Sequence, residues 1–219
     1  MIKTATAPRA APAAAAVSAH PAGATRLSAR ERLLTAADEL FYEGGINLVG
    51  IDRIIEHAGV AKASLYDCFG SKEELIRCYL QGRGERRRTR IQERIAQFQS
   101  ARDKILSVFD LLSQSVAQPN YRGCALLRAG AEAGAGSTIK GACDESRAWL
   151  RTEFTDLARA TGSPDPELLG RQLVLLYDGA TAMAHVDRDL EAPQAARALA
   201  AQLLPAPASA PALRRRHAG

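Results

Sequence analysis

The stretch from Ile51 to Lys72, IDRIIEHAGVAKASLYDCFGSK, constrains the fold more than any other part of the chain. Its first half carries apolar residues at helical spacing, which predicts a short helix with one buried face: Ile51, Ile54, Ile55 and Ala58. Gly59 follows where that helix should stop, because glycine adopts the left-handed conformation without a Cβ clash. We therefore expect a sharp turn after Ala58.

A second short helix is expected to begin at Lys62 and to end at Gly70. Leu65 and Phe69 are four residues apart, so both can dock this helix on the core. The residues left nearer its outer side are polar: Lys62, Ser64, Tyr66 and Asp67. Two helices joined by a short turn that contains glycine form the unit that presents one helix to the major groove of DNA. The stretch thus predicts a helix-turn-helix that binds DNA.

Two sequences of the capping-box form mark the helices on either side of this unit. In Ser71-Lys72-Glu73-Glu74, the Ser71 hydroxyl is expected to accept from the Glu74 amide while the Glu74 side chain reaches back. An earlier box, Ser28 to Glu31, precedes an apolar helical pattern that Gly44-Gly45 terminates. Residues 26–72 are therefore expected to form a three-helix DNA-binding domain.

With these elements in order, Leu33 to Ile76 resembles the DNA-binding domain of the tetracycline-repressor-like (TetR) family of transcriptional regulators. The resemblance covers about a fifth of the chain. No single piece of it is diagnostic, whereas the ordered combination at fixed spacing is specific. The matching residues are Ala37, Leu40-Phe41, Gly45, Ile54, Ala58-Gly59-Val60, Leu65-Tyr66, Phe69, Ser71-Lys72 and Leu75.

The resemblance implies that the second short helix enters the major groove of a DNA operator. By that implication Lys62, Ala63 and Ser64 face bases or nearby phosphates, while Tyr66 and Lys72 match positions that hold phosphates. Lysine supplies a point charge for phosphate, and serine and tyrosine hydroxyls commonly contact the DNA backbone. The competing interpretations are a half-buried core tyrosine at Tyr66 and a solvated first-turn residue at Lys72.

Several residues depart from the family pattern. The family often has threonine where this chain has Val49 and Gly50, and Gly50 offers no hydroxyl to a phosphate although it can begin a helix. Cys68 stands where histidine is common, and we interpret it as a small, partly buried residue rather than a redox sensor. Asp67 either accepts from a cytosine amino group or points away from DNA.

The arginine-rich run from Gly82 to Arg94 extends the helix that begins at Ser71. The resemblance makes residues 73–98 a connecting helix, with Gly82 and Gly84 as the place for a kink. We interpret Arg86, Arg87 and Arg88 as a solvated face of this linker; contact with the DNA backbone is the alternative. The net charge of +5 and the pI of about 9.2 favour an anionic partner without requiring one.

The rest of the chain, up to residue 204, repeats helical apolar patterns without any alternating strand pattern, so the chain is predicted to be all-α. Pro119-Asn120 breaks one pattern, and Asp165-Pro166 and Pro193 start new helices. The resemblance makes residues 73–204 a larger ligand-binding and dimerisation domain, with a homodimer formed through the last two helices. It also implies a small-molecule cavity, for which the candidates are Phe109, Leu112, Leu127, Trp149, Phe154, Tyr177 and Met183; ordinary core packing is the alternative.

The remaining features define the ends of the chain and its environment. Residues 1–25 are read as a disordered Ala/Pro-rich arm, and residues 205–219 as a flexible basic tail. No apolar run approaches the roughly 20 residues that a membrane helix needs. The four cysteines form no CxxC pair and have no histidine at metal spacing, so we expect reduced thiols, no metal, no cofactor and a cytoplasmic, nucleoid-associated protein.

The helix-turn-helix pattern predicts a DNA-binding protein, and the resemblance implies a dimeric, sequence-specific transcriptional regulator that is released from a palindromic operator by a small-molecule ligand, and a repressor rather than an activator. A ligand-responsive activator is the first alternative. A non-specific architectural DNA-binding protein would not need the large helical domain. A helical enzyme lacks support because no phosphate loop, nucleophile elbow or metal spacing is present in the sequence.

Overall fold

The computed structural model describes residues 27–205, which form nine α-helices and no strand. The predicted arm and all of the predicted basic tail except Pro205 lie outside these described residues. The helices are α1 (Ala29–Gly44), α2 (Ile51–Ala58), α3 (Lys62–Phe69), α4 (Lys72–Ile95), α5 (Ala101–Val116), α6 (Ala125–Glu132), α7 (Thr138–Ala160), α8 (Pro166–Val186) and α9 (Ala192–Leu203). The prediction of an all-α chain with an N-terminal helix-turn-helix domain and a larger helical domain is confirmed.

Helix starts follow the capping signals closely, with one correction. At α1 the box is complete, since the Glu31 amide donates to Ser28 Oγ at 3.2 Å and the Ser28 amide donates to the Glu31 carboxylate at 2.8 Å. At α4 only half of the predicted box forms. Ser71 Oγ accepts from the Glu74 amide at 3.1 Å, but the Glu74 carboxylate binds the Arg77 guanidinium instead of reaching back. A charge-assisted pair with two parallel hydrogen bonds is stronger than a bond to one neutral amide.

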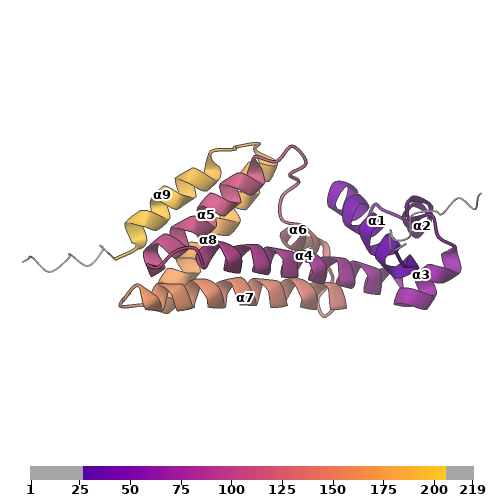
Figure 1. Ribbon diagram of the computed structural model, residues 1–219, viewed down its shortest axis with the longest axis horizontal. Helices are drawn as coiled ribbons and strands as arrows, with labels where there is room; N and C mark the ends of the chain where they lie inside the picture. The colour runs from indigo at the N-terminus through magenta and orange to yellow at the C-terminus, as the bar shows by residue number, and fades with distance from the viewer. Residues whose placement is uncertain (1–26, 206–219) are drawn as a thin grey trace, which may run out of the picture.

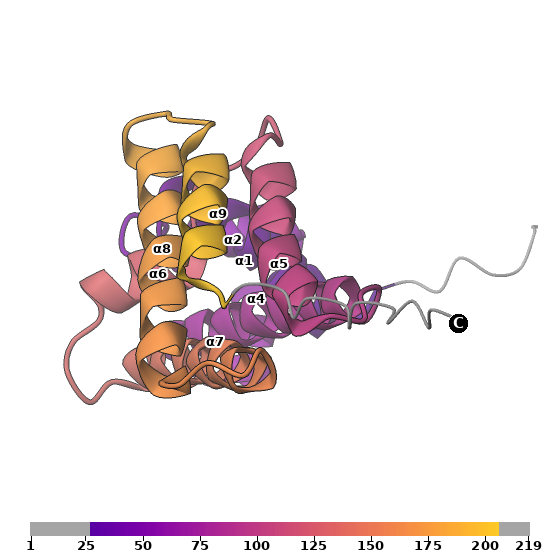
Figure 2. The same cartoon turned by 90° about the vertical axis from the view of Figure 1, so that its left-hand side faces the viewer.

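The helix α4 runs without interruption from the helix-turn-helix end of the molecule to the opposite end (Figure 1). It passes through Gly82 and Gly84 as one helix. Gly84 is buried against α7, so closely that an added Cβ would lie 3.0 Å from Ser146 Oγ. Helix α7 lies alongside α4, while α5, α8 and α9 stand side by side at the far end (Figure 2). The long helix therefore connects the two ends mechanically.

The described residues bury two apolar clusters. One joins α1 to α4 with residues of α6 and α7, and includes Leu33, Phe41 and Leu65. The other fills the space among α4, α5, α7, α8 and α9, and includes Phe109 and Phe154. Because α6 and α7 contribute to the first cluster, helices α1 to α3 share a core with the larger domain. Because this core is closely packed, a displacement of the larger domain should disturb the packing of the helix-turn-helix domain, and the reverse.

Helices α7 and α8 approach each other closely at Gly170. A Cβ added at Gly170 would lie 2.9 Å from the Thr155 backbone Cα, closer than real Cβ atoms come, and would also collide with Thr155 Oγ1. Only glycine fits this crossing without a shift of the helices. At the start of α8, Asp165 caps the helix through its bond to the Leu168 amide at 2.9 Å, and Pro166 occupies the first turn, as predicted.

Across residues 27–205, no helix combines the length and the apolar character that a membrane crossing requires.

Candidate nucleic-acid interface

The turn between α2 and α3 is fixed by backbone geometry and by one arginine. Gly59 has φ 60° and ψ 44°, the left-handed conformation predicted from its place in the sequence. Its amide donates to the Glu56 carbonyl at 3.0 Å, and its carbonyl accepts from the Arg32 guanidinium of α1 at 2.5 Å. The left-handed backbone favours glycine at this position, and a Cβ at Gly59 would lie 2.6 Å from that guanidinium and displace the Arg32 side chain.

Helix α3 presents one apolar face inward and one polar face outward. Leu65 is fully buried and Phe69 is 6% exposed, which confirms that these two residues dock the helix. The residues with exposed side chains are Lys62, Ala63, Tyr66 and Asp67, and Ser64 is half-buried. Tyr66 is 44% exposed, so it is not a core tyrosine. The outward face is therefore free to meet a partner.

Lys62 forms an ion pair that the sequence analysis did not identify. Its ammonium lies 3.0 Å from Asp52 Oδ1 at the start of α2, and this hydrogen bond raises the pKa of Lys62. Both side chains are largely exposed, and exposed pairs of this kind add little stability. Asp52 therefore positions Lys62 at the outer surface while offering it a carboxylate that a phosphate would have to replace.

The two remaining candidates lie at helix starts beside α3. Gly50 is the N-cap residue of α2 and makes no side-chain capping bond, while the neighbouring Val49 is buried in the core. Lys72 is the first residue of α4, and its ammonium lies 5.9 Å from the centroid of the Phe41 ring. Partial burial lowers the pKa of Lys72. Lys72 is thus half-buried over an aromatic ring, rather than fully solvated.

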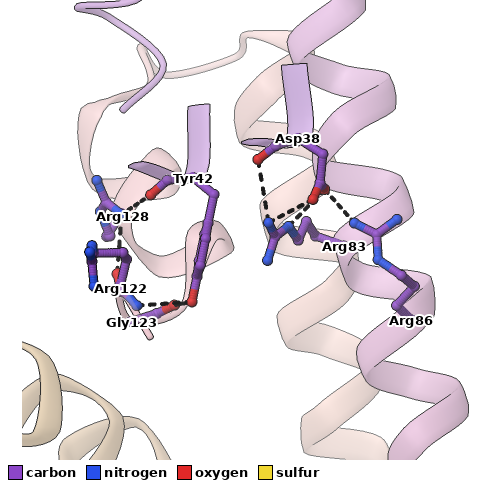
Figure 3. Close-up of polar contacts among 7 residues, drawn as sticks. All are labelled: Asp38, Tyr42, Arg83, Arg86, Arg122, Gly123 and Arg128. Carbon is purple, nitrogen blue, oxygen red and sulfur yellow. Dashed lines mark hydrogen bonds and ion pairs between the residues drawn. The ribbon is translucent and has the colours of Figure 1, made fainter. Parts of the chain in front are cut away.

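A set of polar contacts ties α1 to the rest of the molecule (Figure 3). Asp38 on α1 accepts from Arg83 Nε at 2.8 Å and Nη2 at 2.7 Å, and it also binds Arg86. The Arg83 guanidinium stacks 3.9 Å from the centroid of the Tyr42 ring. Sequence reasoning missed this junction because nothing in the pattern links residues 45 positions apart.

Tyr42 makes the second attachment of α1, toward the segment between α5 and α6. Its hydroxyl donates to the Gly123 carbonyl at 3.2 Å and accepts from the Arg122 amide at 3.0 Å. Arg128 on α6 donates to the Tyr42 carbonyl at 3.0 Å (Figure 3). Helix α1 is therefore held on two sides by residues of the larger domain.

The interpretation of Arg86, Arg87 and Arg88 as a solvated linker face is wrong for two of them. Arg87 is half-buried and donates to the Ser146 carbonyl at 3.0 Å and hydroxyl at 2.9 Å. The guanidinium of Arg88 lies 5.2 Å from the centroid of the Trp149 ring. Helix α7 packs along α4 and partly covers Arg87 and Arg88, whereas Arg86 stays largely exposed.

The structure distributes the seven candidate ligand-binding residues over different environments. Phe109, Phe154 and Tyr177 form an aromatic cluster with ring centroids 6.0 to 6.3 Å apart. Only Leu112 and Tyr177 line the cavity that lies beside α4. Leu127 and Trp149 are half-buried, and Met183 is 47% exposed on α8. The cavity wall also contains arginines, which sequence reasoning had not assigned to a ligand.

The described residues hold no cluster of three or more side chains that would suit a metal ion. The four cysteines are free thiols, and burial raises the pKa of Cys143 to about 11. Cys68 is half-buried, the environment expected for a small packing residue.

Comparison with known proteins supplies independent information on this arrangement. Residues 33–77 match a family described as bacterial regulatory proteins, tetR family. A stretch of 52 residues is 46% identical to the HTH-type transcriptional activator FasR of Mycolicibacterium smegmatis. That match spans 24% of this chain and only 24% of the length of the relative.

Two solved structures extend the similarity over most of the chain. A TetR transcriptional regulator from Streptomyces avermitilis is 31% identical, with a TM-score of 0.70 over 80% of this chain and 98% of its own. A TetR-family transcriptional regulator from Streptomyces coelicolor is also 31% identical, with a TM-score of 0.70 over 79% of this chain and 96% of its own. The similarity thus includes the larger helical domain as well as the helix-turn-helix.

Proposed function

Because this chain belongs to the TetR family of transcriptional regulators, we propose that it is a dimeric repressor that a small-molecule ligand releases from a palindromic DNA operator. The observation that carries the proposal is the outward polar face of α3, held on a rigid turn at one end of the molecule. Lys62, Ala63 and Ser64 are proposed to face bases or nearby phosphates, with Tyr66 and Lys72 on phosphates. Gly50 lies beside them at the start of α2, and Asp67 is the acidic exception.

The far end of the molecule supports a homodimer. Helices α8 and α9 expose large apolar side chains that a monomer would leave in water: Leu168, Leu175, Met183, Val186, Leu199 and Leu203. An exposed apolar patch of this kind marks an interaction surface. A homodimer formed through α8 and α9 would relate the two copies of α3 by a twofold axis. Two such helices bind the two halves of a palindrome when they lie about 34 Å apart, one turn of DNA.

The sign of regulation has two candidates. We propose repression first, with a ligand that acts through the junction between α1 and α4, because that junction lies beside the cavity. Activation is the second candidate, since the Mycolicibacterium smegmatis relative carries the name of an activator. That similarity is confined to about a quarter of either chain, so it bears on DNA recognition more than on whether the protein activates or represses transcription. We propose no enzymatic activity, and a cytoplasmic location in contact with the nucleoid.

Selection of bound duplexes from a random pool tests the proposal. The expected product is an inverted repeat, and a reporter gene under that sequence should be repressed by the protein. Enrichment without symmetry or sequence would support an architectural role instead. Reporter activity that rises with the protein would favour the activator.

Variants of α3 refine this test. Lys62→Ala and Ser64→Ala are expected to change the relative preference among selected sequences, because base contacts carry the sequence information. The matched control is Lys104→Ala on α5, which removes the same charge far from α3. If Lys62→Ala and Ser64→Ala weaken binding to all sequences equally, these residues only position the helix. Unchanged binding in both would remove α3 from the interface.

A further inference from the structure

A cavity of about 320 Å³ lies among α4, α5, α8 and the segment between α5 and α6, beside the end of α1. This volume falls within the range of small-molecule sites, about 300 to 1,000 Å³. Four arginines of α4 line it: Arg83, Arg86, Arg87 and Arg90. Among the described residues, none that lines this cavity is acidic. The wall therefore carries a strong excess of positive charge.

Two of these arginines have only neutral partners. Arg87 donates to the carbonyl and hydroxyl of Ser146, and its Nε is buried without a hydrogen-bond partner among the described residues. Arg90 donates to Ser115 Oγ at 3.1 Å. Asp178 on α8 is near enough to feel the charge of Arg87, but its carboxylate binds Arg147 at 2.9 Å. The guanidinium of Arg87 is partly buried without an anion, which is costly, whereas that of Arg90 is exposed; an anion from solution would relieve the cost at Arg87 and could reach Arg90.

The other two arginines are occupied by a residue of the DNA-binding part. Asp38 accepts from Arg83 at 2.7 and 2.8 Å and also binds Arg86. Asp38 lies on α1, so this pair holds α1 against α4 (Figure 3). An anion that binds in the cavity next to Arg83 and Arg86 competes with the Asp38 carboxylate for the same donors.

The remaining wall suits the body of an organic molecule. Leu112 and Leu126 supply apolar surface, and Tyr121 and Tyr177 supply aromatic rings. Burial raises the pKa of both tyrosines, and the Tyr121 hydroxyl donates to the Thr181 carbonyl at 3.5 Å. A site with apolar walls and a few convergent charged groups binds a ligand that has both characters.

We propose that the effector is a small organic anion, a carboxylate or a phosphate monoester on an apolar or aromatic body. Its acid group binds the arginines of α4 and draws Arg83 and Arg86 away from Asp38. Arginine binds both kinds of acid through two parallel hydrogen bonds. Loss of the Asp38 contacts removes one of the two polar attachments of α1 and changes the placement of α3, while the shared apolar core stays in place. This inference rests on the proposed function, because it names the ligand class and the switch of that same regulator.

The test compares acids with uncharged molecules of the same skeleton on the full-length protein. Isothermal titration calorimetry measures binding of 2-naphthoate against 2-naphthamide, and of 1-naphthyl phosphate against 1-naphthol. At least one acid is expected to bind about tenfold or more tightly than its uncharged counterpart, the value of one charge-assisted hydrogen bond. The acid that does so identifies carboxylate or phosphate as the preferred group. Equal binding within both pairs, or no binding by any probe, overturns the inference.

Two variants locate the acid group. Arg90→Gln is expected to weaken acid binding about tenfold, whereas Arg94→Gln is expected to leave it unchanged. Arg94 is the matched control because it lies one turn further along α4 and outside the cavity, where it donates to Gln97. Equal losses in the two variants would mean that only the general charge of α4 matters, and would overturn the site.

A third variant tests the competition itself. Asp38→Asn removes the rival carboxylate, so the acid is expected to bind about tenfold more tightly than to the unaltered protein. A contact with a purely structural role would give unchanged or weaker binding, which would overturn the switch. DNA binding is measured separately on the selected duplex. A protein that binds its operator but shows no acid preference loses this inference alone, whereas one that binds no specific duplex loses the proposed function.

Discussion

Lys72 gives the sharpest test of the DNA interface, because removal of a phosphate contact changes the salt dependence of binding. Each neutralised phosphate contributes about −0.9 to the slope of log affinity against log salt. A dimer carries two copies, so Lys72→Ala should make the slope less steep by about 1.8. Between 50 and 200 mM salt, the affinity advantage of the unaltered protein over the variant should then shrink by about twelvefold.

The structure defines the side effects of this substitution. The Lys72 ammonium lies 5.9 Å from the Phe41 ring centroid, a contact that contributes about 0.5 to 1 kcal/mol at a partly exposed site. Partial burial lowers the pKa of Lys72 from its ordinary value. Thermal unfolding of the variant should therefore show only a small loss of stability, which separates a binding effect from a folding effect.

Fluorescence anisotropy of a labelled operator, repeated at several salt concentrations, measures the slope. Lys104→Ala is the matched control, because it removes one charge beyond the far end of α4. Helix α4 has 24 residues, a length of about 36 Å at 1.5 Å per residue, so Lys104 is more than a Debye length from α3. An unchanged slope in Lys72→Ala, or an equal change in Lys104→Ala, would refute the phosphate contact.

Three further predictions concern the surface, the core and the thiols. Asp52→Asn should tighten binding to all duplexes several-fold, because it frees Lys62 and removes a negative charge from the proposed interface; the same anisotropy assay detects a weakening that would contradict this. Gly170→Ala should destabilise the protein by about 1 to 3 kcal/mol through overpacking, whereas Gly141→Ala, with open space around its Cβ, should stabilise it by up to about 1 kcal/mol in denaturant titrations. Alkylation of Cys143 should accelerate by about tenfold per pH unit between pH 8 and 10, since its pKa is raised to about 11 and only the thiolate reacts; a rate that levels off above about pH 9 in peptide mass spectrometry would show an unshifted thiol.

Local rules were enough to predict the helix-turn-helix unit. The left-handed Gly59, the inward pair Leu65 and Phe69, and the capped start at Ser28 all depend on residues within four positions of each other. Spacing and backbone preference are therefore enough to predict them without reference to any long-range contact. The half-formed box at Ser71 shows the limit of such rules, because Glu74 had two local partners and the charged one prevailed.

The role of the arginine run was decided only by tertiary structure. The sequence determined that α4 is helical and strongly basic, and it located the polar outer face of α3. It did not determine that Arg87 lies under α7, or that Arg83 joins α1 through Asp38. A guanidinium has the same local preferences whether it faces water, a carboxylate or a cavity. The packing of helices distant in sequence chooses among these environments, and that choice gave the chain its positively charged pocket.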